Sequence, residues 1–355
     1  MRDGVEIDAG VGAWSGRQNL VPARQERSAE LLGTGLSTHD PPVQMLLTVA
    51  PAQYLHSRNV EHVGHVALAL HAQRCGLASR PTTPALTEAW ADADRLARVS
   101  ARTLNVSELG ESGSRIAFCH GLFGQGKNWT QPGKALASEH RVTLIDMPNH
   151  GRSAWTETFS YADMADSVAT LFSADDPVTL VGHSMGGKVG MVLALRHPDL
   201  VAKLVVVDVS PVSYDAGRRE FAGYIEAMKA LDMTTLASRA DADTALRSAV
   251  PNTTVRSFLL QNLRREGDQW RWQLNLRLLG DQLEALGGWP DIDETSDVPV
   301  LWIGGANSPY VLDDYAPAME QLFSRVRRVS IKNAGHWVHS EQPDVFLDVL
   351  KRFVD

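Results

Sequence analysis

The stretch VTLVGHSMGGKVGMVLAL, residues 178–195, joins a short apolar run to a helical pattern through a corner rich in glycine. In this corner Ser184 has glycine two positions before it and two positions after it, Gly182 and Gly186. Residues without a β-carbon leave room where a strand turns sharply into a helix, and the strained turn exposes the serine hydroxyl. The stretch therefore predicts a strand, a sharp turn and a helix. Because a glycine-rich turn can also bind a phosphate or merely connect two elements, its surroundings must decide its role.

Short apolar runs alternate with helical patterns from about residue 103 onward. Strands that alternate with helices need crossover connections, which predicts an α/β fold with a mostly parallel sheet and helices on both faces. The expected strands are RIAFC, RVTLID, PVTLVGH, KLVVVDVS, VPVLWIGG and RVRRVSI, and the expected helices include SYADMADSVATLF, MGGKVGMVLALRH and PDVFLDVLKRFVD.

A long insertion, residues 211 to about 296, interrupts this alternation. It contains several helical patterns and no convincing strand for the central sheet, so we expect a helical cap over one end of the sheet. The clearest of these patterns are RREFAGYIEAMKALD, TTVRSFLLQNL and NLRLLGDQLEAL.

The first 102 residues have weaker strand signals, and we expect them to form an N-terminal extension, partly helical or flexible, outside an α/β domain that spans residues 103–355. Two patterns in the extension predict helices, VEHVGHVALALHAQRCGLA and PALTEAWADADRLARVSARTL. The extension is interpreted as a regulatory or dimerising appendage, a flexible segment, or an upstream reading of a start site near Thr103. Five histidines, at positions 39, 56, 62, 65 and 71, have no acidic or cysteine partner at ligand spacing, so no metal site is predicted.

Composition and charge limit the kinds of molecule that this protein is expected to bind. The chain has 355 residues, 44% of them hydrophobic, and a net charge of −8, which is typical of a globular protein with an ample core and argues against binding to nucleic acid. Two distant cysteines, Cys75 and Cys119, indicate neither a disulfide framework nor a zinc site. Because no basic leader with an apolar run and no apolar stretch of membrane-spanning length occurs, we expect a cytoplasmic protein without an integral membrane segment. Its oligomeric state is left open.

A second motif, HGLFG at residues 120–124, follows the expected strand RIAFC. In a fold with a serine at such a turn, this position provides one backbone amide for an oxyanion, and the residue after the serine provides the other. We therefore assign the amides of Leu122 and Met185 to an oxyanion hole. The start of the following helix adds the favourable end of its dipole.

Two more strand ends supply an acid and a histidine. Asp208 ends the run KLVVVDVS, and His336 lies in NAGHWVH after the last expected strand. A serine hydroxyl needs an imidazole to take its proton, and the imidazole needs a carboxylate to fix its tautomer. We predict Ser184 as nucleophile, His336 as general base and then acid, and Asp208 as the orienting carboxylate. His339 is the rival histidine, but His336 directly follows a flexible Ala-Gly pair.

Several spaced segments together identify a family. The chain from about residue 103 to residue 355 resembles the α/β-hydrolase superfamily, and within it the small esterases of the YbfF type and their mitochondrial relatives. This resemblance implies an eight-stranded, mostly parallel sheet with a helical cap. It also implies hydrolysis of carboxylic esters or thioesters of short to medium acyl chains through an acyl-enzyme, without cofactor or metal. The segments are HGLFGQGKNW, DMPNHGRS, GHSMGGKVGM, VVDVSP, FLLQNL, GGANSPYV and NAGHWVHSEQPD.

One departure from the general superfamily concerns the acid. Its usual place is just after the penultimate strand, where this chain reads GGANSP and offers no carboxylate before Asp313 and Asp314. The close relatives share the NSPY run and carry an aspartate that matches Asp208 one strand earlier. The resemblance therefore favours Asp208.

Other residues around the site have less specific interpretations. We expect Phe123 and Trp337 to line the substrate site, and consider Trp129, Trp270 and Trp272 as further apolar walls. Arg277 is either a solvated surface residue or a recognition residue for an anionic acyl group or a coenzyme A phosphate. Lys188 is expected to pair with a nearby carboxylate. Two alternatives to ester hydrolysis stay open, which are an acyltransferase with the same triad and a non-catalytic ligand-binding protein of this fold.

Overall fold

The computed structural model describes residues 5–7, 104–214 and 218–355. Its strands are β1 (Val5–Ile7), β2 (Val106–Leu109), β3 (Ser114–Cys119), β4 (His140–Ile145), β5 (Val178–His183), β6 (Val201–Val207), β7 (Leu263–Glu266), β8 (Gln269–Trp272), β9 (Val300–Gly305) and β10 (Val326–Ile331). Its α-helices are α4 (Thr130–Leu136), α5 (Tyr161–Ala169), α6 (Met185–Arg196), α7 (Arg218–Lys229), α8 (Arg239–Leu246), α9 (Thr253–Leu260), α10 (Leu276–Asp281), α11 (Leu283–Gly287), α12 (Ala316–Leu322), α13 (Val338–Glu341) and α14 (Pro343–Val354). Short 3-10 helices are η2 (Gly126–Trp129), η3 (Pro198–Leu200) and η4 (Asp313–Tyr315).

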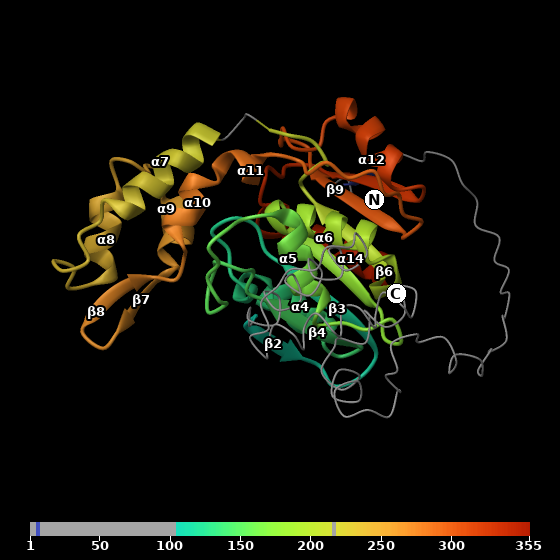
Figure 1. Cartoon of the computed structure of the whole chain (residues 1–355), viewed down its shortest axis with the longest axis horizontal. Helices are drawn as coiled ribbons and strands as arrows, with labels where there is room; N and C mark the ends of the chain where they lie inside the picture. The colour runs from blue at the N-terminus through green and yellow to red at the C-terminus, as the bar shows by residue number, and fades with distance from the viewer. Residues whose placement is uncertain (1–4, 8–103, 215–217) are drawn as a thin grey trace, which may run out of the picture. The chain divides into compact units, whose positions relative to one another are not determined.

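The central sheet has the order β1-β10-β9-β6-β5-β3-β4-β2 (Figure 1). Neighbouring strands from β4 to β10 are parallel, whereas β2 runs antiparallel to β4 and β1 runs antiparallel to β10. The predicted mostly parallel sheet is thus confirmed. The sheet reaches eight strands only with β1, which comes from the segment that we expected to lie outside this domain; residues 104–355 supply the other seven.

The strands of this sheet are buried on both faces. In β6, Leu204 and Val206 belong to one hydrophobic cluster, and Val205 and Val207 belong to the cluster on the opposite face. Side chains alternate across a strand, so a strand covered on both sides needs an apolar residue at nearly every position. This requirement explains why the expected strands read as unbroken apolar runs in the sequence.

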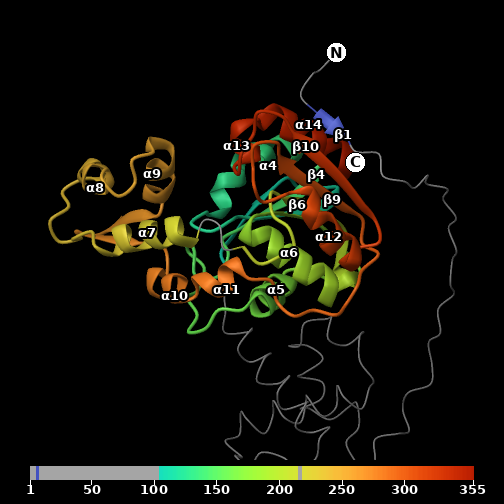
Figure 2. The same ribbon diagram turned by 90° about the horizontal axis from the view of Figure 1, so that it is seen from above.

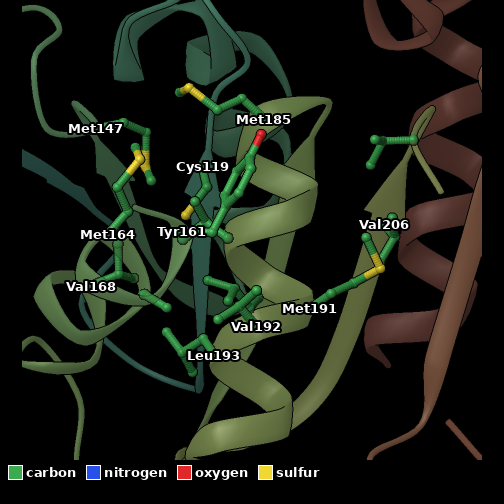
Figure 3. Close-up of a cluster of buried hydrophobic side chains, with 14 of the residues drawn as sticks. Cys119, Met147, Tyr161, Met164, Val168, Met185, Met191, Val192, Leu193 and Val206 are labelled. Atoms are coloured by element: carbon green, nitrogen blue, oxygen red, sulfur yellow. The ribbon is translucent and has the colours of Figure 1, made fainter. Parts of the chain in front are cut away.

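Helices cover both faces of the sheet, as Figure 2 shows, with α5 and α6 on one side and α4 and α14 on the other. The α5–α6 side is rich in flexible sulfur-containing side chains. Met147 and Met164 lie on one side of α6 in Figure 3, and Val206 lies on the other. Methionine fills irregular gaps in a core, which suits the curved space between a twisted sheet and two helices.

The cap contains α7 to α11 and a hairpin formed by β7 and β8 (Figure 1). Its helices agree with the expected patterns, and the hairpin adds two short strands that those patterns did not predict. Leu263 pairs with Trp272 across the hairpin, and Gly267 takes a positive φ of 61° at its turn. The pair of short strands is separate from the central sheet, and for this reason it did not match the pattern of a core strand.

Some sequence-based expectations fall outside the described residues. These are the two helices predicted before residue 103, the five histidines of that region and Cys75. Within the described ranges, none of the helices combines the length and the apolar character that crossing a bilayer requires.

Candidate active site

Ser184 lies at a sharp turn between β5 and α6. Its backbone has φ 52° and ψ −120°, a conformation that L-residues rarely adopt. A β-carbon on Gly182 would lie 2.2 Å from the carbonyl oxygen of Gly186, and one on Gly186 would lie 2.4 Å from the carbonyl oxygen of Cys119. Both glycines are therefore required by close contact between backbones. The strand, strained turn and helix that the sequence predicted are all present.

Strained residues mark the ends of five strands. In the described part of the chain, the non-glycine residues with positive φ follow β3, β4, β5, β6 and β10. The carboxyl ends of parallel strands share one edge of a sheet, so these turns gather at the same place. Strain of this kind persists where the surrounding structure fixes it, and it concentrates at functional sites. The five residues are Phe123, Asn149, Ser184, Asp208 and Asn333.

Asp208 and His336 are in direct contact. Oδ2 of Asp208 lies 2.8 Å from Nδ1 of His336, and Asp208 is completely buried. The carboxylate also accepts hydrogen bonds from the Gly305 amide at 2.8 Å and from the Ser308 hydroxyl at 2.5 Å. Gly305 is the last residue of β9 and Ser308 follows it, and β9 lies between β6 and β10 in the sheet. The usual position of the acid in the superfamily is thus occupied here by groups that hold Asp208.

His336 is held from two sides. The ring of His183 donates a hydrogen bond through Nε2 to the His336 carbonyl at 2.8 Å, and the Tyr310 ring lies 4.4 Å from the His336 ring. His336 keeps 14% of its side chain exposed. An imidazole fixed by a carboxylate on Nδ1 presents its Nε2 to other groups, as proton transfer requires.

The rival histidine, His339, lies in different surroundings. Its half-buried ring stacks on Trp129 at 4.3 Å, and its buried Nδ1 has no hydrogen-bond partner in the described structure. Burial lowers the pKa of His339 to about 3, which keeps the ring neutral. Of these two histidines, His336 lines a cavity together with Ser184 and His339 does not.

Two cavities meet at Ser184. The larger has a volume of about 50 Å³ and extends over α6 past Met185 to Lys188. The smaller has a volume of about 30 Å³, and His336 lies in its wall. Leu122 lines both cavities, so the two predicted oxyanion residues, Leu122 and Met185, lie beside the serine.

The amides of these two residues differ in setting. Met185 begins α6, so its N–H has no acceptor within the helix. Leu122 lies in a turn closed by a hydrogen bond of 2.9 Å from the Gly124 amide to the Gly121 carbonyl. Both positions are compatible with binding of an oxyanion, and their assignment stays a prediction.

The predicted substrate-binding residues Phe123 and Trp337 both line the smaller cavity. Each contacts an aromatic residue of the cap, Phe123 with Phe221 of α7 and Trp337 with Phe258 of α9. The three other tryptophans that we considered do not line either cavity. Trp129 packs in the core, and Trp270 and Trp272 pack against a cluster within the cap.

The fold and this geometry agree with what known proteins show. Residues 115–343, more than half of the chain, match the family described by the alpha/beta hydrolase fold. The chain belongs to the α/β-hydrolase family. It is similar to the sn-1-specific diacylglycerol lipase ABHD11 of Danio rerio, with 35% identity over 299 residues that cover 79% of this chain and 94% of that protein.

This hydrolase is also 34% identical to esterase YbfF of Escherichia coli over 244 residues, which cover 68% of this chain and 93% of YbfF. Among solved structures, a marine microorganism esterase matches 70% of this chain and 98% of its own, with a TM-score of 0.68 and 33% identity. The predicted resemblance to YbfF-type esterases and their relatives is confirmed.

Lys188 corrects an expectation about charge pairing in this hydrolase. Its side chain is buried, and Nζ donates to the carbonyl oxygens of Val212 at 3.0 Å, Gly287 at 2.8 Å and Gly288 at 2.6 Å. The ring of Tyr214 lies 4.9 Å from the same nitrogen. Three carbonyls take the place of the carboxylate that we expected. Burial lowers the pKa of Lys188 to about 7.

Two further groups lie away from the cavities. Arg277 is exposed and lies 3.9 Å from the exposed Glu157, which favours the interpretation as a surface residue. Within the described residues, Glu139, His140 and Asp355 are close enough together to share a cation. They gather at the start of β4, whereas Ser184 follows the carboxyl end of β5, so they do not form part of the candidate active site.

Proposed function

We propose that this α/β-hydrolase is a serine hydrolase that cleaves carboxylic esters or thioesters through an acyl-enzyme. Ester hydrolysis as the class of reaction follows from the family and from its relatives named esterase and lipase. The observation that supports the mechanism is the meeting of Ser184 and His336 in one cavity, with the Asp208 carboxylate 2.8 Å from the imidazole.

In the proposed reaction, Oγ of Ser184 attacks the carbonyl carbon while Nε2 of His336 takes the hydroxyl proton. The amides of Leu122 and Met185 stabilise the oxyanion of the tetrahedral intermediate. His336 then gives its proton to the leaving alkoxide or thiolate, and an acyl group stays on Ser184. A water molecule, activated by His336, attacks this acyl-enzyme and releases the acid. The buried Asp208 stabilises the imidazolium that forms twice in this cycle.

The two cavities suggest where each half of the substrate binds. The leaving oxygen receives its proton from His336, so we place the leaving group in the smaller cavity, which has His336 in its wall. The acyl group then extends into the larger cavity, past Met185 toward Lys188. A cavity of about 50 Å³, with the buried Lys188 side chain in its wall, supports short to medium acyl chains. Phe123 and Trp337 contact the leaving group in this arrangement.

A series of p-nitrophenyl esters of increasing acyl length tests this proposal. We expect turnover of short and medium chains, no turnover by Ser184→Ala, and a single fluorophosphonate adduct in the intact mass of the wild type only. Ser167→Ala is the matched control, since it removes a buried hydroxyl of α5 outside both cavities. Labelling without hydrolysis, with ester formed when an alcohol is added, would instead indicate acyl transfer. A folded protein that is never labelled would contradict the proposal and favour a ligand-binding role.

We also propose that the protein works in the cytoplasm. Cys119 is a free cysteine, which suits a reducing compartment, where disulfides are rare. Cell fractionation of the tagged full chain tests this location, and enrichment with an organelle would contradict it.

A further inference from the structure

A buried asparagine of the cap binds the loop after β3, which carries Leu122 and is called the oxyanion loop below. Asn262, between α9 and β7, is completely buried, and its Nδ2 donates a hydrogen bond of 2.7 Å to the carbonyl of Phe123. Phe123 directly follows Leu122, whose amide we assign to the oxyanion hole. A side chain from the cap therefore binds the carbonyl of the residue that follows the oxyanion donor.

Phe123 needs such support because its backbone is strained. Its φ of 63° lies in the left-handed region, which is unusual for a bulky aromatic residue. Two contacts hold it there. Its N–H donates to Nε2 of His150 at 3.3 Å, and its carbonyl accepts the shorter bond from Asn262. Without the Asn262 bond, Phe123 can relax toward negative φ and displace the peptide that it shares with Leu122, and this peptide adjoins the Gly121–Leu122 peptide that carries the donor N–H.

The orientation of the Asn262 amide is itself fixed. A carbonyl can only accept, so the nitrogen of Asn262 must face Phe123 and the oxygen must face the other way. That oxygen accepts a hydrogen bond of 2.6 Å from Nε2 of Gln125, which belongs to the loop that follows Phe123. Both ends of the cap amide are thus bound by the loop that carries the oxyanion donor.

We propose that Asn262 is a positioning residue for the oxyanion hole, and that through it the seating of the cap controls stabilisation of the transition state. This inference rests on the proposed serine-hydrolase function. It implies that loss of the Asn262 amide lowers kcat while substrate binding in the ground state changes little, because the oxyanion exists only after attack by Ser184.

A second buried asparagine of the cap provides a matched control. Asn275 is 7% exposed, and its Nδ2 donates to Oδ1 of Asn149 at 3.1 Å and to the Thr156 carbonyl at 3.2 Å. It joins the cap to the loop after β4 instead of the loop after β3. Asn262→Ala and Asn275→Ala therefore delete the same group from two contacts between cap and core, and only the first contact touches the oxyanion loop.

The experiment compares these two variants in the full chain, with thermal unfolding as a check of folding. For Asn262→Ala we expect kcat to fall about 10- to 100-fold, less than the loss of an entire oxyanion donor, with KM within about threefold. The inhibition constant of a trifluoromethyl ketone, which forms an oxyanion with Ser184, should rise by the factor by which kcat/KM falls. Asn275→Ala should keep kcat within about threefold.

Unchanged kcat in Asn262→Ala, or equal losses in both asparagine variants, would overturn the inference. If Asn262→Ala does not fold, Gln125→Ala serves instead, because it removes the group that orients the Asn262 amide. We expect a smaller fall in kcat for this variant, and an unchanged kcat would refute the positioning role of Asn262. Failure of the proposed function gives a different result, since the wild type would then hydrolyse no ester and take no fluorophosphonate label, or Ser184→Ala would hydrolyse esters as fast as the wild type.

Discussion

Oδ2 of Asp208, at the end of β6, lies 2.8 Å from Nδ1 of His336, although β9 separates the strands that lead to these residues. The carboxylate spans this gap because it is bound by Gly305 and Ser308 at the end of β9. We predict that Asp208→Asn lowers kcat by about 10⁴-fold, since an amide favours the wrong imidazole tautomer. Steady-state hydrolysis of a p-nitrophenyl ester measures this effect.

Two carboxylates near the usual position of the acid serve as controls. Asp313 is exposed and is paired with Arg328 at 2.7 Å, and Asp314 lies beside it in η4. Asp313→Asn and Asp314→Asn should keep kcat within about twofold, as is usual for surface substitutions. If either variant lost activity while Asp208→Asn kept it, the assignment of the acid would be wrong.

The Ser308 hydroxyl should help to hold the Asp208 carboxylate in its orientation toward His336. Ser308→Ala removes a hydrogen bond to a charged oxygen, an interaction that contributes about 1.5–3 kcal/mol. We expect kcat to fall about tenfold, with a smaller change in KM, because Asp208 becomes free to rotate away from His336. Ser308→Thr keeps a hydroxyl and should restore most of kcat. Equal activity of the alanine and threonine variants would contradict a role for this bond.

Substitutions of His336 and of His339 should have very different effects on kcat. His336→Ala is expected to abolish turnover, with a loss on the order of 10⁶-fold for a triad member. His339→Phe preserves a flat ring against Trp129 and removes no hydrogen bond that the structure contains, so kcat should stay within about threefold. Kinetics of the two purified variants decide between them. An inactive His339→Phe with normal folding would reverse the assignment.

Lys188 gives a prediction about stability and pH. Its pKa is about 7 in the folded protein and ordinarily about 10.5, so between these values the unfolded chain binds a proton that the folded chain has released. Stability rises with pH wherever the unfolded state binds more protons, by up to about 1.4 kcal/mol per pH unit for one group. From pH 7.5 to 9.5, the free energy of unfolding of the wild type should therefore rise relative to that of Lys188→Met.

Urea unfolding at several pH values measures this difference. Lys134→Met, at an exposed lysine of α4, is the control and should run parallel to the wild type. A difference between wild type and Lys188→Met that stays constant with pH would show that the buried amine does not change its charge in this range.

The N-terminal segment should contribute to stability more than to catalysis. A chain that begins at residue 100 lacks β1. In the full chain the three residues of β1 pair antiparallel with β10, with Val5 opposite Ile331 and Ile7 opposite Val329. We expect the truncated chain to melt at a lower temperature, since β10 then becomes an edge strand, and to keep kcat/KM within about threefold. Calorimetry and ester hydrolysis test both parts, and a folded but inactive truncated chain would refute the second.

The parts of the site that the sequence predicts are those set by local rules. Close backbone contacts require Gly182 and Gly186 around Ser184, and the order of serine, aspartate and histidine along the chain follows from the order of the strands. The alternation of apolar runs and helices similarly predicts the sheet, because burial on both faces leaves a continuous apolar signal.

The rest depends on partners that have no local signal. Lys188 binds three backbone carbonyls, and a carbonyl is present at every position of any sequence, so nothing distinguishes these partners in advance. Asn262 meets Phe123 only after the cap has folded back. The β7–β8 hairpin did have a signal, Gly267 followed by an aspartate between short alternating runs, which is typical of a tight turn between two strands.

The contacts of Lys188 also show how the cap is joined to the rest of the protein. Val212 lies where the insertion begins and Gly287 lies near its end, yet both carbonyls are within 3.0 Å of one nitrogen. The chain therefore leaves and rejoins the sheet domain at a single point. The free energy of closing such a loop rises by only about 0.6 kcal/mol for each doubling of its length. A cap of a different length can therefore close at the same point of the sheet domain with little change in free energy.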